Sequence, residues 1–386
     1  MADDSFTVTS NQSWFSRLGG AIAGVLFGIV LFLAAFPFLT WNEGRAIHRA
    51  KTLETGSKAV ISVPATPVDA ANEGKLVHVT GNVAAGGPVS DPRFAVSAPG
   101  ILLQRNVEMY QWIEDKKSET KQKIGGGEET VTTYTYAKKW SSDVIDSSDF
   151  QKPEGHENPT EMPAPSKTFT ASDVTLGAYT LPSDLIEKID NFTPLSLPAD
   201  QALPTGFSAP AHRTSDGFYL GTDPATPAVG DARVKFEVAL PGPISVIARQ
   251  VQHTFEPYSV ARLGTIELLQ IGTVSADSMF QAEAQANTIL TWLLRLAGFL
   301  MMFFGLMLIS RPLSVVASVL PFLGDLMSAG AGLIALIVAL PLTITTIAIA
   351  WIAYRPLIGI PLLVVAGVSI FIAARSLPRK PVKAAA

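Results

Sequence analysis

The chain has 386 residues, a formal net charge of −4, no cysteine, and 48% hydrophobic against 16% charged residues. Soluble domains usually carry about 25% charged residues, so this composition, with its long uncharged runs, favours an integral membrane protein. The net charge argues against nucleic acid as a partner, because phosphate binding needs clustered Lys and Arg. The absence of cysteine excludes a disulfide framework, thiolate metal sites and cysteine nucleophiles.

The first apolar segment follows residues 1–17, which we expect to form a cytoplasmic tail. Leu18–Leu39 has 22 residues without a charge, enough to span about 30 Å of hydrocarbon as a helix and too many for a cleavable signal peptide core. The pattern predicts an uncleaved signal anchor, transmembrane helix 1, over residues 18–40. Glycines at every fourth position predict a close-packing helix face, directed either to another subunit or to the chain's own bundle. They are Gly20, Gly24 and Gly28.

Residues 41–288 predict a β-rich domain outside the cytoplasm, either periplasmic or lumenal. From Asn42 onward it holds 21 Lys and Arg against 30 Asp and Glu, so it is acidic. Val107–Ile113 and Val131–Tyr136 alternate and are rich in β-prone residues, which predicts two strands joined by a long polar connection that closes on three glycines. Further strands are expected at 75–81, 233–240 and 244–250.

Two helices are expected within or beside this domain. Thr180–Asn191 predicts a short helix with its N-cap at Ser183–Asp184. Ala276–Thr288 is polar and helix-favouring, so we expect it to continue into the second span as a stalk.

Three more spans are predicted over residues 289–374. They are Ile289–Ile309, Gly332–Ala353 and the shorter Leu357–Ala374, the last two with prolines that predict kinks. Leu313–Leu323 is apolar but too short to cross, and we interpret it as an interfacial or re-entrant piece. The predicted fold class is therefore an integral membrane α+β protein with four transmembrane helices, one N-terminal and three C-terminal, and a large β-rich extracytoplasmic domain.

Basic residues beside the spans indicate the orientation. Arg17, Arg311 and the basic tail at 375–386 would share one side of a four-span protein, and the positive-inside rule makes that side cytoplasmic. The protein is then a multi-pass protein of a bacterial inner membrane with a periplasmic domain, or of a eukaryotic endomembrane with a lumenal one.

Charged residues in or near the membrane are the first candidate functional residues. Arg295 is the only charge inside a predicted span, and it can snorkel to the interface, pair with another helix or line a pathway. A basic group just beyond the first span could contact anionic lipid head groups, or could be ordinary solvated charges offset by Glu43 and Glu54. This group is Arg45, Arg49 and Lys51.

The sequence predicts no catalytic residue, cofactor or metal site. The five histidines are scattered without metal-ligand spacing, and no nucleophile motif occurs. His156 lies among glutamates, which permits either a metal cup or, as we expect, a solvated loop. The string Asn42-Glu43-Gly44-Arg45 returns as Asn72-Glu73-Gly74-Lys75, and each copy predicts a turn with its glycine at positive φ.

Several unusual strings occur in a fixed order along most of the chain. They are Asn42-Glu43-Gly44-Arg45-Ala46, the segment Asn72–Val79, VEMYQW at Val107–Trp112, Gly155-His156 with Asn158-Pro159, Asp190-Asn191-Phe192, VIARQ at Val246–Gln250, and Tyr354-Arg355-Pro356-Leu357. These strings resemble the transmembrane protein 43 (LUMA) family. The resemblance marks a set of positions as family-typical without assigning them roles: Asn42, Glu43, Gly44, Asn72, Glu73, Gly74, Glu108, Tyr110, Trp112, His156, Asn158, Asp190, Asn191 and Arg355.

The resemblance also implies a function. Animal members of this family are described as self-associating scaffolds of the endoplasmic reticulum and inner nuclear membrane that contact lamins and emerin, and such partners would apply only to a chain from an animal. The family supplies no established catalytic residues.

The leading hypothesis is a non-enzymatic membrane scaffold that organises membrane or envelope structure, with a second copy of itself and membrane lipids as partners. One alternative is an oligomeric channel or transporter that uses Arg295, breaks at Pro341 and Pro361, and a polar path at Thr343, Thr345 and Thr346. Another is a lipid-binding membrane enzyme.

Overall fold

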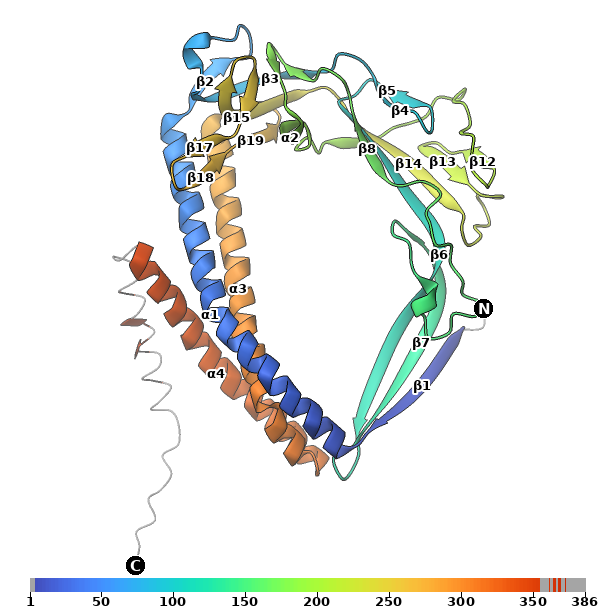
Figure 1. The fold of residues 1–386 in the computed structure, drawn as a ribbon, viewed down its shortest axis with the longest axis vertical. Coiled ribbons are helices and arrows are strands. Elements are labelled where there is room, and N and C mark those ends of the chain that lie inside the picture. Colours follow the sequence, from blue (N-terminus) through green and yellow to red (C-terminus); the bar gives the residue numbers. More distant parts are fainter. Residues whose placement is uncertain (1–3, 355–360, 362–363, 366, 369–371, 373–386) are drawn as a thin grey trace, which may run out of the picture. The chain divides into compact units, whose positions relative to one another are not determined.

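The computed structural model describes residues 4–354 and a few scattered positions between 361 and 372. The chain divides into two compact units, whose elements are labelled in Figure 1. The first, called here the β domain, comprises Met1–Val8, Thr52–Lys117 and Thr132–Ala282. The second, called the membrane unit, comprises Thr9–Lys51, Ser118–Val131 and Glu283–Ala386.

The larger sheet has eight strands among the described residues, in the order β1-β7-β6-β14-β13-β12, with β8 pairing to β6 and β11 to β14. Their bounds are β1 Ser5–Gln12, β6 Leu102–Gln122, β7 Glu128–Ser141, β8 Lys167–Thr170, β11 Phe192–Pro194, β12 Ala211–Arg213, β13 Gly217–Leu220 and β14 Ala232–Ala239. The predicted strand at 233–240 is thus confirmed as β14.

The smaller sheet has seven strands in the part of the chain that the structure describes, in the order β19-β15-β16-β10-β9-β3-β2. Their bounds are β2 Ile61–Pro64, β3 Leu76–Ala84, β9 Thr175–Leu176, β10 Tyr179–Thr180, β15 Pro243–Val251, β16 Thr254–Glu256 and β19 Leu268–Ile271. β3 and β15 confirm the strands predicted at 75–81 and 244–250. Two short ribbons complete the strands: β4 Val89–Asp91 with β5 Val96–Ala98, and β17 Tyr258–Val260 with β18 Gly264–Ile266.

The core of the β domain follows from the two-residue period of its strands. In β14, Val234 and Phe236 are fully buried, while Lys235 between them is exposed. Phe236 contacts the ring of Phe94 with centroids 5.8 Å apart, and Phe218 stacks on the same Phe94 ring. These three rings form an aromatic centre within the core of the β domain.

The β6–β7 hairpin differs from its prediction. The polar stretch after residue 113, expected to be a long connection, is itself strand, and only residues 123–127 join β6 to β7. Its side chains are exposed from residue 115 to 121, so no apolar alternation marked it as strand. Backbone pairing with β7, and not burial, keeps it extended.

The short predicted helix is α2, Ser183–Ile186, which covers only part of its predicted segment. Its N-cap is Pro182, without a side-chain hydrogen bond, so the expected Ser183–Asp184 cap is wrong. Pro182 is suitable there because its fixed φ matches the entry to a helix and it lacks an N–H to be left unpaired. Two 3₁₀ turns are also present, η1 at Ala70–Asn72 and η2 at Ser147–Asp149.

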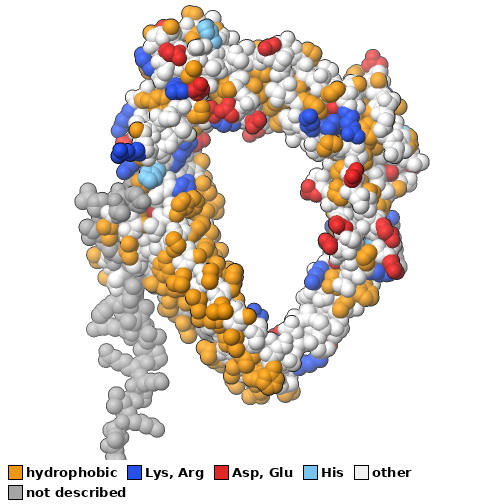
Figure 2. Space-filling model, viewed as in Figure 1, with side chains coloured by type: hydrophobic (Ala, Val, Ile, Leu, Met, Phe, Trp, Pro, Cys, Tyr) orange, Lys and Arg blue, Asp and Glu red, His pale blue; other side chains and the backbone are white. Residues whose placement is uncertain are grey.

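Three helices are long and apolar enough to cross a membrane among the described residues: α1 Trp14–Ala59, α3 Ala276–Ala317 and α4 Pro321–Tyr354. Each contains one predicted span, and the stalk expected at 276–288 is confirmed as the first part of α3. Figure 2 shows hydrophobic side chains gathered over the surface of these helices, as lipid contact requires. The fourth expected span, Leu357–Ala374, lies largely outside the described residues.

The predicted helix boundaries need two corrections. α1 continues far past the first span to Ala59, so Asn42-Glu43-Gly44-Arg45 is helical and not a turn. Gly74, in the second copy of that string, does have a positive φ of 74°. The apolar piece at 313–323 is not a separate segment: it comprises the end of α3, a turn, and the start of α4.

Residues 4–12, expected to belong to a tail, are also structured. β1 pairs with β7, and the Tyr136 N–H donates to the Asp4 carbonyl at 2.9 Å. Asp4 to Val8 therefore belong to the β domain. A cytoplasmic tail and an extracytoplasmic domain cannot both hold while β1 is paired with β7.

Candidate functional site

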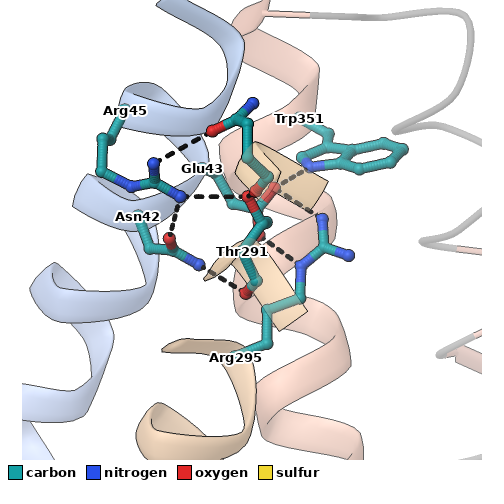
Figure 3. A network of polar contacts seen from close by, with 7 residues as sticks. Asn42, Glu43, Arg45, Thr291, Arg295 and Trp351 are labelled. Atoms are coloured by element: carbon teal, nitrogen blue, oxygen red, sulfur yellow. Dashed lines mark hydrogen bonds and ion pairs between the residues drawn. The ribbon is translucent and has the colours of Figure 1, made fainter. Parts of the chain in front are cut away.

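The most strongly connected polar group in the membrane unit is centred on Glu43 of α1. Its side chain is only 1% exposed, and its carboxylate receives two hydrogen bonds from Arg295 of α3 (Figure 3). Arg295 Nε lies 2.7 Å from Oε1 and Nη2 lies 2.8 Å from Oε2. This is the bidentate geometry that a planar guanidinium forms with a carboxylate.

Two tryptophans complete the site. The indole N–H of Trp351 on α4 donates to the Glu43 carboxylate. The Arg295 guanidinium also lies 4.6 Å from the Trp292 ring centroid and 5.4 Å from that of Trp351, within cation–π range. Side chains from all three long helices therefore converge on one buried ion pair, which we call the Glu43–Arg295 cluster.

A second polar group lies beside this cluster, from residues next to Glu43 on α1 and from the preceding turns of α3. Arg45 donates to Asn287 Oδ1 and Thr291 Oγ1, both at 3.0 Å, and to Asn42 Oδ1 at 3.3 Å. Asn42 in turn donates to the Thr291 carbonyl at 3.1 Å. Asn287, Thr291 and Arg295 are spaced by four residues, so they share one face of α3.

Close helix packing brings these side chains together. A Cβ on Gly28 would lie 2.8 Å from the Gly305 carbonyl oxygen, and one on Gly298 would lie 2.4 Å from Leu39. α1 and α3 therefore touch backbone to backbone at Gly28 and Gly305, as small residues allow in membrane helices. The predicted glycine face is used within the chain at Gly28, whereas a Cβ on Gly20 would meet no described atom within 4 Å.

Comparisons with known proteins show which family the chain belongs to. The family model described as Transmembrane protein 43 matches residues 109–356, well over half of the chain. The chain belongs to the transmembrane protein 43 family. It is 38% identical to Transmembrane protein 43 of Rattus norvegicus, over 97% of this chain and 95% of the relative.

Other relatives of the family agree with this assignment. The chain is 36% identical to the Homo sapiens protein of the same name, over 96% of this chain and 95% of the relative. It is 32% identical to the Drosophila melanogaster homolog, over 90% and 93%. No solved structure matches the chain. As a member of the transmembrane protein 43 family, it is a multi-pass membrane protein.

The family-typical residues in the β domain hold local structure. Asn158 donates to the Trp112 carbonyl at 2.9 Å and accepts from the Trp112 N–H at 2.7 Å, so its amide pairs with β6 as a strand would. Glu108 forms an ion pair with Arg233 at 2.5 Å across β6 and β14. The Tyr110 ring packs on Trp140 with centroids 5.1 Å apart.

The remaining family-typical positions divide between turns and undescribed residues. Glu73 accepts a hydrogen bond at 2.7 Å from the Gln252 N–H, beside the η1 turn that contains Asn72. The Asp190 carbonyl accepts from the Phe192 N–H at 2.8 Å, closing a turn around Asn191. Arg355 lies outside the described residues. None of these contacts indicates a catalytic role.

His156 is neither in a metal cup nor in a solvated loop. It is 2% exposed, and its Nδ1 lies 2.9 Å from the Lys152 carbonyl while Nε2 lies 2.8 Å from the Asp4 carboxylate. Its ring stacks on the ring of Tyr136. Burial and a hydrogen bond to Glu114 raise the pKa of Tyr136 to about 12. Among the described residues, no group of three potential ligands could hold a metal ion. His156 instead fastens the N-terminal strand to the β domain.

Most of the predicted lipid-facing and pathway residues are engaged in other contacts, whereas the buried Thr345 hydroxyl has no hydrogen-bond partner among the described residues. Arg45 is held by α3, and Arg49 forms an ion pair with Glu283 at 2.5 Å, so both serve the α1–α3 contact. Lys51 also has interactions of its own. On the proposed polar path, the Thr343 hydroxyl donates to Met302 Sδ at 3.4 Å and Thr346 donates to a carbonyl of its own helix.

Sequence reasoning identified Arg295 but missed its partner Glu43. Glu43 is separated from Arg295 by 252 residues, and its string was interpreted as a turn. A usable signal was present in α3: three polar side chains at 287, 291 and 295, spaced by four in an apolar helix, predict a buried polar helix contact.

Proposed function

We propose that this protein is a non-enzymatic membrane scaffold that associates with copies of itself and organises the membrane in which it lies. The proposal is supported by the division of the glycine face of α1. Gly28 packs against Gly305 of the same chain. By contrast, a Cβ on Gly20 would meet no described atom within 4 Å, and one on Gly24 would meet only Leu308, at 3.9 Å. These two positions offer a small-residue surface on which a second α1 can pack.

The Glu43–Arg295 cluster supports a structural and not a transport role. Its charges neutralise each other inside the helix contact, and both carboxylate oxygens and two of the guanidinium nitrogens are hydrogen-bonded. An arginine held in this way is a poor ligand for a passing ion, because exchange would break a buried pair. The arrangement instead fixes α1, α3 and α4 as one surface for association.

We further propose a fourth span at Leu357–Ala374, a compartment outside the cytoplasm for the β domain, and membrane lipids as partners of the apolar helices. Contacts with lamins or emerin would follow only in an animal cell. Exposed apolar side chains along α1 support the lipid contact, among them Leu26, Phe27 and Val30.

The particle mass in nanodiscs, measured by mass photometry, tests self-association. We expect wild type to exceed the mass of one chain, and Gly20→Leu with Gly24→Leu to shift the population towards monomers, because the added side chains separate the packing helices. Leu26→Ile on the same helix is the matched control and should leave the mass unchanged. A monomeric wild type, or a double variant with the wild-type mass, would contradict the scaffold.

A further inference from the structure

The tip of the β6–β7 hairpin carries one large apolar side chain in polar surroundings. Residues 114–123 are all charged or polar, and three glycines follow Ile124. The Ile124 side chain is 90% exposed, the highest exposure among the large apolar residues that the structure describes. An aliphatic side chain at the apex of a polar hairpin has no folding role that would explain it.

The loop is shaped to present this side chain. The Lys123 N–H donates to the Gly127 carbonyl at 2.8 Å, and the Gly126 N–H donates to the Lys123 carbonyl at 3.1 Å. Gly125 and Gly126 have φ angles of 93° and 80°, which only glycine adopts readily. This tight closure leaves the Ile124 side chain outside the hairpin.

The hairpin tip is fastened to the ends of the membrane helices. The Gly125 N–H donates to the Val319 carbonyl at 3.1 Å, in the turn between α3 and α4. Trp14, the first residue of α1, covers Gly126, where a Cβ would lie 2.3 Å from the indole. Ile124 is therefore held at the level where α1 begins and α3 turns into α4.

The charges near the apex are neutralised locally. Arg17 forms an ion pair with Glu128 at 2.6 Å and also donates to the Ser318 hydroxyl at 3.1 Å. Lys123 forms an ion pair with Glu129 at 2.5 Å. Paired charges lower the cost of placing this region at a membrane interface. They also remove Arg17 as a free positive charge for setting orientation.

Two further aromatic side chains are exposed at the same helix ends. Phe15 is 78% exposed beside Trp14, and Phe322 is 74% exposed at the start of α4. Aromatic residues concentrate at the interface between head groups and hydrocarbon. The exposed apolar surface continues from these residues along α1 and α4, so the occupant that fits it is the lipid that surrounds those helices.

We propose that the apex of the β6–β7 hairpin, with Ile124 at its tip, inserts into the interfacial layer of a lipid bilayer beside Phe15 and Phe322. The hairpin is thereby a membrane-contacting element of its own, in addition to the helices. This insertion does not depend on self-association.

Site-directed fluorescence tests this insertion, because the chain has no cysteine and one can be added at a time. Ile124→Cys, labelled with an environment-sensitive probe, is compared in phosphatidylcholine vesicles with Leu26→Cys on α1 and Val144→Cys on the β domain. All three positions are exposed in the chain. Quenchers are placed in water as iodide and in lipid as doxyl groups at shallow and deep positions.

We expect the probe at position 124 to have blue-shifted emission and to be quenched by the shallow doxyl groups. The deep doxyl groups should mainly quench the probe at position 26. The probe at position 144 should be quenched by iodide alone. Iodide quenching at position 124 equal to that at 144 would overturn the proposal. Protection of position 124 from all quenchers would also overturn it, because a second protein and not lipid would then cover the apex.

Discussion

Glu43 and Arg295 are charged side chains buried among helices that are otherwise apolar. Their pair is stable only because each charge has its partner and its hydrogen bonds: Glu43 accepts from Arg295 and Trp351, and Arg295 lies against two indole rings. Removing one partner of a buried pair leaves the other charge without compensation. Removing both partners leaves no uncompensated charge. The pair is therefore a determinant of how the three helices meet.

Arg295→Leu should destabilise the protein by about 3–5 kcal/mol, the usual penalty for leaving a buried charge alone. The double variant Glu43→Leu with Arg295→Leu should lose less than this single variant. Arg295→Lys should not restore wild-type stability, because an ammonium cannot form the bidentate pair. Chemical unfolding in detergent measures all three variants.

Arg49→Leu is the matched control for these variants. Its pair with Glu283 is about one-third exposed, so its loss should cost about 0.2–1 kcal/mol, as for surface pairs. Equal losses for Arg49→Leu and Arg295→Leu, or an additive loss in the double variant, would show that the Glu43–Arg295 pair is not held as described.

At the scale of helices, the contact between α1 and α3 depends on two glycines that face each other. Gly28→Ala places a methyl group 2.8 Å from the Gly305 carbonyl oxygen, so the helices must move apart. We expect a loss of about 1–3 kcal/mol, the usual penalty of overpacking. In the single chain, dissociated in detergent, Gly20→Ala meets open space and should be neutral, or stabilising by up to about 1 kcal/mol through helix propensity.

The same detergent unfolding assay compares the two alanine variants. Because the substitution is identical and only its surroundings differ, the comparison isolates packing from propensity. A loss at Gly20→Ala as large as that at Gly28→Ala would mean that α1 does not pack on α3 through Gly28.

The elements differ in how far the sequence could predict them. Long apolar runs and alternating strands were predictable, because burial in lipid or in a core imposes composition directly. The helical stretch of α1 after residue 41 was not, because its buried side chains, such as Ala46 and Leu53, alternate with charged ones. The polar part of β6 was missed because only backbone pairing defines it, and Glu43 because its partner is distant in the chain.

At the scale of the whole molecule, both flanks of α1 belong to the β domain. Asp4 to Val8 precede the helix and belong to this domain. The last residues of α1, from Thr52 onward, belong to it as well, and there Leu53 packs with Ile266 and Phe280 in a core of the domain. A helix with both flanks in one domain cannot cross a bilayer with that domain entirely on one side. Either β1 is unpaired in the membrane, or the hairpin that accompanies it also crosses, or the helix does not cross.

Sealed membrane vesicles with single cysteines decide among these three arrangements, using an impermeant maleimide before and after permeabilisation. Ser5→Cys reports on β1, Ser90→Cys on the β domain, and Leu320→Cys on the α3–α4 turn. Ser5 is exposed in β1, but its strand is held by the contact between the Asp4 carboxylate and the buried His156 ring. We therefore expect Ser5→Cys and Ser90→Cys to react from the same side.

The reaction at Leu320 then identifies the path of the hairpin. If Leu320→Cys reacts from the side opposite to Ser90→Cys, a bilayer separates the α3–α4 turn from the β domain. The hairpin tip would lie with that turn, because Gly125 is hydrogen-bonded to Val319. The exposed charges of β6 would then have to cross in a polar shelter, which lipid cannot supply but neighbouring chains can. If Leu320→Cys reacts from the same side as Ser90→Cys, α1 and α3 enter the bilayer without crossing it, which would contradict the multi-pass assignment. Opposite-side reaction of Ser5 and Ser90 would show instead that β1 detaches from β7 in the membrane.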